Sequence, residues 1–214
     1  MNYSARSSSR RDGQQRAEAR RRIRRRRLSF VGVAAVLVGV AVIVTMPLLR
    51  KAVNELTLPL HYADVIRQQA GEKHLDPALI AGVIYAETKF QPRDSSAGAV
   101  GPMQIMPQTA SFLARRSGAT TFTTADLNTP QVNIAYGSYY LRYLLNEYHQ
   151  NVTLALAAYN GGESNVDRWL ADARAEGHTF GVSDIAFPET RAYVLRVLRA
   201  RDQYRHKYAS QLYG

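Results

Sequence analysis

The chain has 214 residues and no cysteine, which excludes a disulfide framework and thiolate chemistry. Its five histidines form neither an HExxH motif nor a close pair, and no nucleotide-binding glycine motif occurs, so we expect no metal site and no cofactor. The formal net charge of +11 is typical of nucleic-acid-binding proteins, but its distribution along the chain argues against that class.

Most of the positive charge lies in residues 1–27, which hold 11 arginines against Asp12 and Glu18, a net charge of +9. The rest of the chain has a net charge of only +2. The segment is rich in Arg, Ser and Gln and nearly free of apolar residues, so we expect it to be disordered. We interpret it as a solvated charge run that sets membrane topology, and we expect no nucleic-acid partner.

Residues 28–49 follow as an uncharged, almost wholly apolar run, long enough to cross the hydrocarbon core of a bilayer. The preceding arginines predict a cytoplasmic N-terminus and an extracytoplasmic segment over 50–214. A cleaved signal peptide is the alternative, but its apolar region would be unusually long and no A-x-A site follows Met46. We therefore predict a single-pass anchor in the cytoplasmic membrane, then a linker over 50–59 and a catalytic domain over 60–214.

The extracytoplasmic part is predicted to be mainly α-helical, without a convincing sheet. Periodicity and helix start signals predict helices over 60–72, 77–90, 108–116, 152–159 and 163–175, and two more that begin at Pro130 and Pro188. Glycines and prolines interrupt the segment between 92 and 108, which is therefore predicted to be a shaped loop. Asn160-Gly161-Gly162 should end the helix of 152–159; a two-residue hairpin there is the alternative, but no alternating strands flank it.

Glu87 lies on an apolar face of the helix predicted over 77–90. Asp76-Pro77 is a strong start signal, with a side-chain acceptor at the cap and proline at the first helical position. At about 100° per residue, Glu87 falls in the middle of the buried face, whereas Thr88 points elsewhere. A carboxylate that loses hydration holds its proton more tightly, so Glu87 could donate a proton at neutral pH as a general acid. A salt bridge to a buried arginine is the alternative.

Side chains suited to carbohydrate follow further along the chain. Gln104 has an amide that both donates and accepts hydrogen bonds, and Tyr159, Asn160 and Tyr193 offer flat faces with polar ends. Sugars combine an apolar ring face with a rim of hydroxyls, so an acid with amides and tyrosines suits a glycan cleft. Taken singly, Gln104 could instead cap the next helix, and Tyr193 could belong to the core.

Several segments occur in a specific order: ETKF, SSAGAVGPMQIMP, DLNTPQVNIAYGSYYL, ALAAYNGG and ETRAYVLRVL. In this order they resemble the lytic transglycosylases with a soluble-lytic-transglycosylase domain, which are related to goose-type lysozyme. The resemblance spans roughly residues 60–208. It implies an α-helical, lysozyme-like fold and, as substrate, the glycan strands of peptidoglycan.

The resemblance also implies roles for individual residues. Glu87 corresponds to the family's single catalytic acid/base. The substrate-binding residues that it implies are Ser95, Gln104, Met106, Tyr159, Asn160, Glu189 and Tyr193. Thr88 stands where serine is common and keeps the hydroxyl, whereas Pro102 replaces a usual leucine, removes a backbone N–H and stiffens the loop.

The reaction that the resemblance implies needs one carboxylate. Glu87 would protonate the oxygen between N-acetylmuramic acid and N-acetylglucosamine, the muramoyl C6 hydroxyl would attack its own anomeric carbon, and ionised Glu87 would take that hydroxyl's proton. The product would be a 1,6-anhydromuramoyl end. Ordinary glycosidases need a second carboxylate; we interpret Asp94 as a turn residue, and Glu189 as orienting the cleft or starting a helix.

Two other functions stay open at this point. A lysozyme-type muramidase would cleave the same bond with water. A non-catalytic wall-binding scaffold would use the tail and anchor to recruit partners, but the glutamate at position 87 disfavours it. The partners that we expect are peptidoglycan glycan strands and the membrane, with cell-envelope protein complexes as further candidates.

Overall fold

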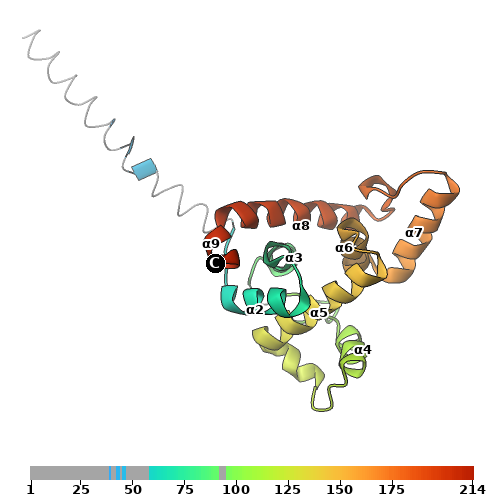
Figure 1. The fold of residues 1–214 in the computed structure, drawn as a ribbon, viewed down its shortest axis with the longest axis horizontal. Helices are drawn as coiled ribbons and strands as arrows, with labels where there is room; N and C mark the ends of the chain where they lie inside the picture. The colour runs from blue at the N-terminus through green and yellow to red at the C-terminus, as the bar shows by residue number, and fades with distance from the viewer. Residues whose placement is uncertain (1–38, 40–41, 44, 47–57, 92–94) are drawn as a thin grey trace, which may run out of the picture. The chain divides into compact units, whose positions relative to one another are not determined.

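A computed structural model describes residues 39, 42–43, 45–46, 58–91 and 95–214 (Figure 1). The chain divides into two units, 1–56 and 57–214. The tail predicted over 1–27, most of the anchor predicted over 28–49 and most of the linker lie outside the described residues. Among the residues that are described, none belongs to a helix with the length and apolar character needed to cross a bilayer.

The described part of the second unit is helical, as predicted, and its strand pairing is limited to one isolated antiparallel bridge between Val100 and Ile105. The elements, in chain order, are α2 (Ala63–Lys73), α3 (Pro77–Thr88), α4 (Pro107–Ser117), η1 (Thr124–Asn128), α5 (Pro130–Glu147), α6 (Val152–Gly161), α7 (Glu163–Ala175), η2 (Val182–Asp184), α8 (Pro188–Lys207) and α9 (Ala209–Tyr213) (Figure 1).

Proline starts four of these helices, because its fixed φ suits the first helical position and its missing N–H would be unpaired there anyway. The Asp76 side chain accepts from Ala78 N at 3.0 Å and caps α3, as predicted. The helix α2 begins later than predicted, because Tyr62 takes a left-handed conformation with φ 58°. The elements η1, η2 and α9 escaped prediction, since three to five residues are too few for a periodic signal.

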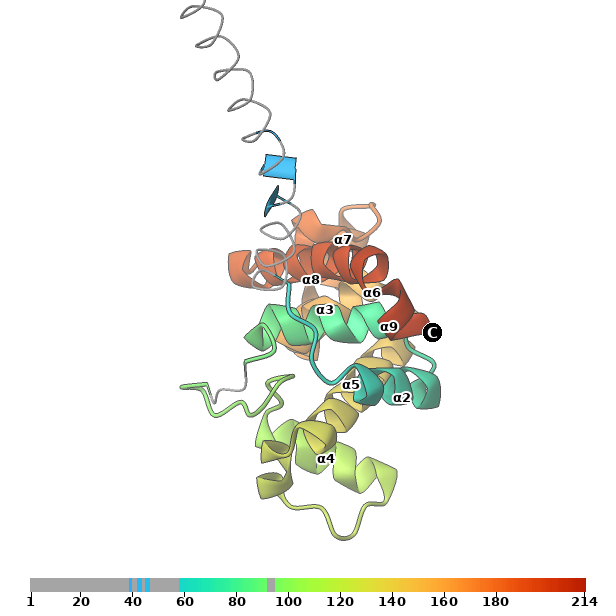
Figure 2. The ribbon, with the colours of Figure 1, turned by 90° about the vertical axis from the view of Figure 1, so that its left-hand side faces the viewer.

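The helix α3 is the centre of the fold, and the prediction that it buries a single face was too narrow. Every residue from Pro77 to Ile84 is buried, as expected for a helix that is apolar on all sides. Figures 1 and 2 show α3 between α8 on one side and α2 on the other. Its closest approach to α8 is at Gly82, where an added Cβ would lie 3.0 Å from the Val197 carbonyl oxygen.

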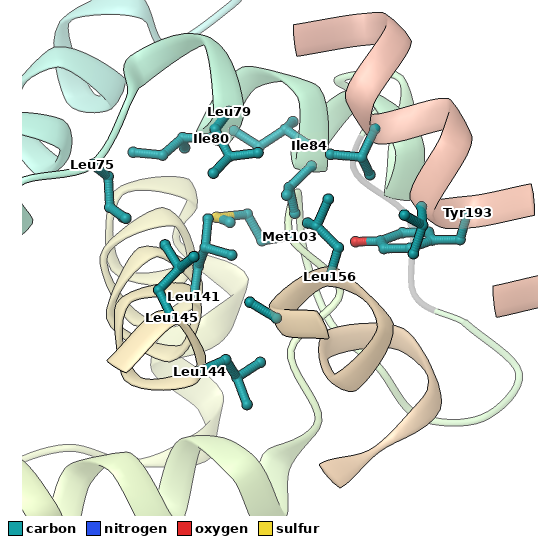
Figure 3. Packing of buried hydrophobic residues seen from close by; sticks show 14 of the residues in the cluster. Leu75, Leu79, Ile80, Ile84, Met103, Leu141, Leu144, Leu145, Leu156 and Tyr193 are labelled. Atoms are coloured by element: carbon teal, nitrogen blue, oxygen red, sulfur yellow. The ribbon is translucent and has the colours of Figure 1, made fainter. Parts of the chain in front are cut away.

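The core gathers around α3 (Figure 3). Leucines of α5 and α6 pack beneath it, and Met103 reaches the same cluster from the loop before α4. Ile134, Leu141 and Leu144 form an apolar stripe along α5 and are fully buried. The last turn of α3, which carries Glu87, is thereby fixed by the best-packed part of the molecule.

The contact at Gly82 can be tested by Gly82→Ala. We expect a loss of about 1–3 kcal/mol in the free energy of unfolding, because the new methyl group meets the backbone of α8 and overpacks the contact. Gly71→Ala in α2 is the matched control: its Cβ meets nothing within 4 Å, so alanine should stabilise the helix by up to about 1 kcal/mol. Urea unfolding measures both, and equal effects would contradict the close packing of α3 on α8.

Candidate functional site

Glu87 lies in the last turn of α3 and is partly buried. Burial raises the pKa of its carboxyl group from an ordinary value of 4.5 to about 7, against the opposing effects of the Tyr193 hydroxyl and the Arg196 charge. The loss of hydration therefore outweighs both favourable partners. A carboxyl group with a pKa of about 7 can both give and take a proton at neutral pH, as the apolar surroundings in the sequence suggested.

Tyr193 reaches Glu87 from α8 and is only 3% exposed. Its ring lies among core side chains, with the hydroxyl directed inward between α3 and α6 (Figure 3). Burial and the Glu87 charge raise the pKa of Tyr193 well above its ordinary value, so the phenol stays neutral. Under strict geometric limits its hydroxyl forms no hydrogen bond among the described residues, although it lies near enough to the Glu87 carboxyl group to lower the pKa of that group. Because buried hydroxyls rarely lack partners, this donor is available to Glu87 or to a bound molecule.

Tyr159 of α6 lies near the same carboxyl group. Burial, and to a smaller extent the Glu87 charge, raise the pKa of the Tyr159 hydroxyl well above its ordinary value. That hydroxyl donates to the Met103 carbonyl oxygen at 2.9 Å. Tyr159 thus joins α6 to the loop between α3 and α4, a positioning contact that the sequence did not predict.

The described part of that loop, residues 95–106, is shaped by local hydrogen bonds. Ser95 Oγ accepts from Ala99 N at 2.9 Å, and Ser95 N donates to Ala99 O at 2.9 Å, so Ser95 closes a tight turn. Gln104 takes a left-handed conformation with φ 49°, and its amide donates to Gly101 O at 2.9 Å. Such a conformation in a residue other than glycine needs support from its surroundings.

Asn133 of α5 gives much of that support, although the sequence analysis assigned it no role. It is fully buried; its Oδ1 accepts from Met103 N at 2.8 Å, and its Nδ2 donates to Val100 O at 2.7 Å and to Leu127 O at 3.2 Å. The available signal was a polar residue beside the apolar stripe of α5, immediately before Ile134. Buried side-chain amides usually serve the backbone in this way.

Thr88, after Tyr159 and Asn133, is the third side chain that holds the loop from a helix, and the prediction that it points elsewhere was wrong. It is 2% exposed, and its hydroxyl lies 2.9 Å from Pro102 O and 3.1 Å from Ile84 O. The error arose because the prediction considered one helix face, whereas the loop covers α3 from another side. The residue after Glu87 therefore ties the loop directly to the helix that carries the acid.

Four of the predicted substrate-binding residues line one open cleft of about 330 Å³: Gln104, Met106, Tyr159 and Asn160. Met106 is 39% exposed there, and Asn160 is held by a 2.8 Å hydrogen bond from Thr190 Oγ1 to its Oδ1. Tyr140 of α5, which was not predicted, completes the wall with its ring centroid 5.2 Å from that of Tyr159. The cleft thus combines apolar faces with amides.

Three predicted substrate-binding residues, Ser95, Glu189 and Tyr193, do not line this cleft, and neither does Glu87. Ser95 lies in the turn described above, and Glu189 is exposed in the first turn of α8. Among the described residues Glu189 makes neither a hydrogen bond nor an ion pair that would direct it to Glu87. Within the same part of the chain, no three His, Asp or Glu side chains are grouped so that they could hold a metal ion.

The role of Asn133 can be tested by Asn133→Asp, which keeps the size and the acceptor but replaces the donor. We expect a loss of about 2–3 kcal/mol in unfolding free energy, because a buried carboxylate would face two carbonyl oxygens. The control is Asn128→Asp, whose exposed amide makes one hydrogen bond, to Ala125 O, and should change stability by less than about 0.5 kcal/mol. Similar urea midpoints for the two variants would contradict the role of Asn133.

Glu87→Gln should change how stability depends on pH. The folded-state pKa is the raised one, so this group's stabilisation is complete below pH 4.5 and is lost as pH rises through about 7. Glutamine removes that loss. Between pH 4 and pH 8 the free energy of unfolding of the variant, relative to that of wild type, should therefore rise by about 3 kcal/mol. Urea unfolding at both pH values measures it. A constant difference would mean that folding leaves the pKa of Glu87 unchanged, and a relative gain of the variant as pH falls would mean that Glu87 is ionised in a salt bridge.

Comparisons with known proteins show to which family this chain belongs. Residues 64–179 match the family described as Transglycosylase SLT domain. The soluble lytic murein transglycosylase of Salmonella typhimurium is 33% identical over 156 residues, which cover 71% of this chain and 24% of that protein. The membrane-bound lytic murein transglycosylase C of Actinobacillus pleuropneumoniae is 30% identical over 167 residues, 68% of this chain and 46% of that protein.

Solved structures share the fold at 30% identity. An inactive mutant of the lytic transglycosylase Slt from Pseudomonas aeruginosa superposes with a TM-score of 0.66, over 73% of this chain and 26% of that one. The 70 kDa soluble lytic transglycosylase in complex with bulgecin A gives a TM-score of 0.65, over 70% of this chain and 25% of that one. This chain spans about a quarter of the length of the soluble relatives.

Proposed function

We propose that this chain, which belongs to the Transglycosylase SLT domain family, is a lytic transglycosylase that cleaves the β-1,4 bond between N-acetylmuramic acid and N-acetylglucosamine in peptidoglycan. The observation that carries the proposal is Glu87, whose carboxyl group has a pKa of about 7 in a rigid helix end beside Tyr193. The names of the relatives, soluble and membrane-bound lytic murein transglycosylases, support the same substrate.

Glu87 would serve both halves of the reaction. In its protonated form it gives its proton to the glycosidic oxygen as the bond from that oxygen to the muramoyl C1 breaks. The carboxylate that results takes the proton of the muramoyl C6 hydroxyl, whose oxygen forms a new bond to C1. No water is consumed, and the product is a 1,6-anhydromuramoyl end. A pKa near the working pH suits a group that must be acid and then base.

The other residues would bind and orient the glycan. Tyr193 would donate its buried hydroxyl to Glu87 or to the sugar. The cleft lined by Gln104, Met106, Tyr159 and Asn160 would hold further sugars, with Tyr140 as an added wall. Ser95 would act through the turn that it closes, and Glu189 would act from the exposed start of α8, orienting the glycan rather than attacking C1.

The decisive experiment is digestion of purified sacculi by wild type and by Glu87→Gln, with mass analysis of the products. We expect anhydromuropeptides from wild type and a loss of at least about 10⁴-fold in the variant, because the amide can neither give nor retrieve a proton. Glu147→Gln, at an exposed position of α5, should keep full activity. Reducing ends instead of anhydro ends would favour a lysozyme-type muramidase. A folded Glu87→Gln that keeps more than a tenth of the activity would remove Glu87 from the mechanism.

We also propose that residues 28–49 anchor the enzyme in the cytoplasmic membrane, with residues 50–214 on the extracytoplasmic side. The uncharged run behind an arginine-rich tail supports this, as does similarity to a relative named membrane-bound. Protease added to intact spheroplasts should degrade residues 50–214 and spare the tail. Protection of the large part, or a mature N-terminus after Met46, would rule the anchor out.

A further inference from the structure

A second groove lies on the outer side of α8, where that helix meets α3. It has a volume of about 420 Å³ and is lined by Tyr85, Ala192, Leu195, Arg196, Arg199, Ala200 and Gln203. We call it the α3–α8 groove. Its floor is apolar, and Leu195 is 39% exposed within it. Its polar character comes from two arginines and one glutamine, so a ligand that fits it has an apolar body and acidic groups.

The two arginines lie one turn apart on the same face of α8. Among the described residues, neither Arg196 nor Arg199 forms an ion pair with a carboxylate at salt-bridge distance. Further along the same helix, by contrast, Arg201 pairs with Asp202 and Arg205 pairs with Asp76. The groove therefore presents two uncompensated guanidinium groups, whose planar donors bind carboxylates in pairs of hydrogen bonds.

The groove begins beside the proposed acid. Neither Glu87 nor Tyr193 lines the groove, but the lining residue Arg196 lies close enough to Glu87 for its charge to act on that carboxyl group. Arg196 connects the two helices, because its guanidinium donates to Ala86 O at 3.4 Å and its charge acts on Glu87. A carboxylate bound by Arg196 would therefore lie near a sugar held at Glu87.

Resting on the proposed function, we propose that the α3–α8 groove binds the peptide stem of the muramoyl residue whose bond Glu87 cleaves. That stem is attached to C3 of the same sugar ring and carries free carboxylates along a short peptide. From Ala192 to Gln203 the helix rises about 16 Å at 1.5 Å per residue. An extended peptide advances about 3.4 Å per residue, so the groove accommodates four or five stem residues. Arg196 and Arg199 would bind two of their carboxylates.

The test compares full-length enzyme on two forms of the same soluble glycan strands, one with peptide stems and one from which an amidase has removed them. We expect wild type to prefer the strands with stems, and Arg199→Gln to lower that preference in kcat/KM about tenfold, through KM. Arg199 is the better target than Arg196, because Arg196 also acts on Glu87. The matched control is Arg174→Gln on α7, an exposed arginine outside the groove, which should keep the wild-type preference.

A binding experiment decides the matter without turnover. Calorimetry with a free stem tetrapeptide should give about tenfold weaker binding to Arg199→Gln than to wild type and Arg174→Gln. Equal binding by all three, or an unchanged preference on active enzyme, would overturn the proposal. Loss of binding to anionic phospholipid vesicles in Arg199→Gln, with unchanged peptide binding, would assign the groove to a lipid surface and also overturn it. Absence of activity on either glycan would refute the proposed function, and peptide binding would still test the groove.

Discussion

The loss of hydration at one carboxyl group is the constraint on which the site depends. Glu87 projects from the end of a helix whose earlier turns are buried on every side, so the core fixes the position of its backbone. The C-terminal end of a helix also carries partial negative charge, which disfavours a carboxylate there. The opposing effects of Tyr193 and Arg196 are too weak to restore an ordinary pKa. The fold thereby maintains a proton donor that would be ionised at neutral pH if it were fully hydrated.

The same core fixes the loop that faces this acid. Thr88 binds the Pro102 carbonyl, Asn133 binds the Met103 N–H, and Tyr159 binds the Met103 carbonyl. These side chains come from α3, α5 and α6, so the two adjoining residues are held from three directions. Gln104 follows directly and is forced into its left-handed conformation. The polar loop is held firmly here, because the backbone groups of Pro102 and Met103 each have a side-chain partner on a neighbouring helix.

The sequence predicted those features that depend on one element at a time. The cap at Asp76, the proline starts and the burial of Glu87 follow from local chemistry and helical periodicity. The inward direction of Thr88, the role of Asn133 and the contribution of Tyr140 depend on which element lies opposite, and no single helix carries that information. Side-chain chemistry suggested Gln104 and Asn160 for a glycan cleft, but each alone also has an ordinary structural interpretation, and Met106 was proposed from the family resemblance alone.

Arg196 of α8 lines the α3–α8 groove and also acts on the proposed acid. Arg196 lowers the pKa of Glu87 because its positive charge favours the carboxylate. If a stem carboxylate paired with Arg196 in the α3–α8 groove, that charge would be compensated and the pKa of Glu87 would rise above about 7. The acid would then be more fully protonated when a peptide-bearing sugar is bound than when the cleft is empty. Departure of the stem would restore the effect of Arg196, which favours the carboxylate, and would return the pKa of Glu87 to about 7. Binding of the stem would in this way be coupled to protonation of Glu87, and the coupling would depend on Arg196, which lies near both.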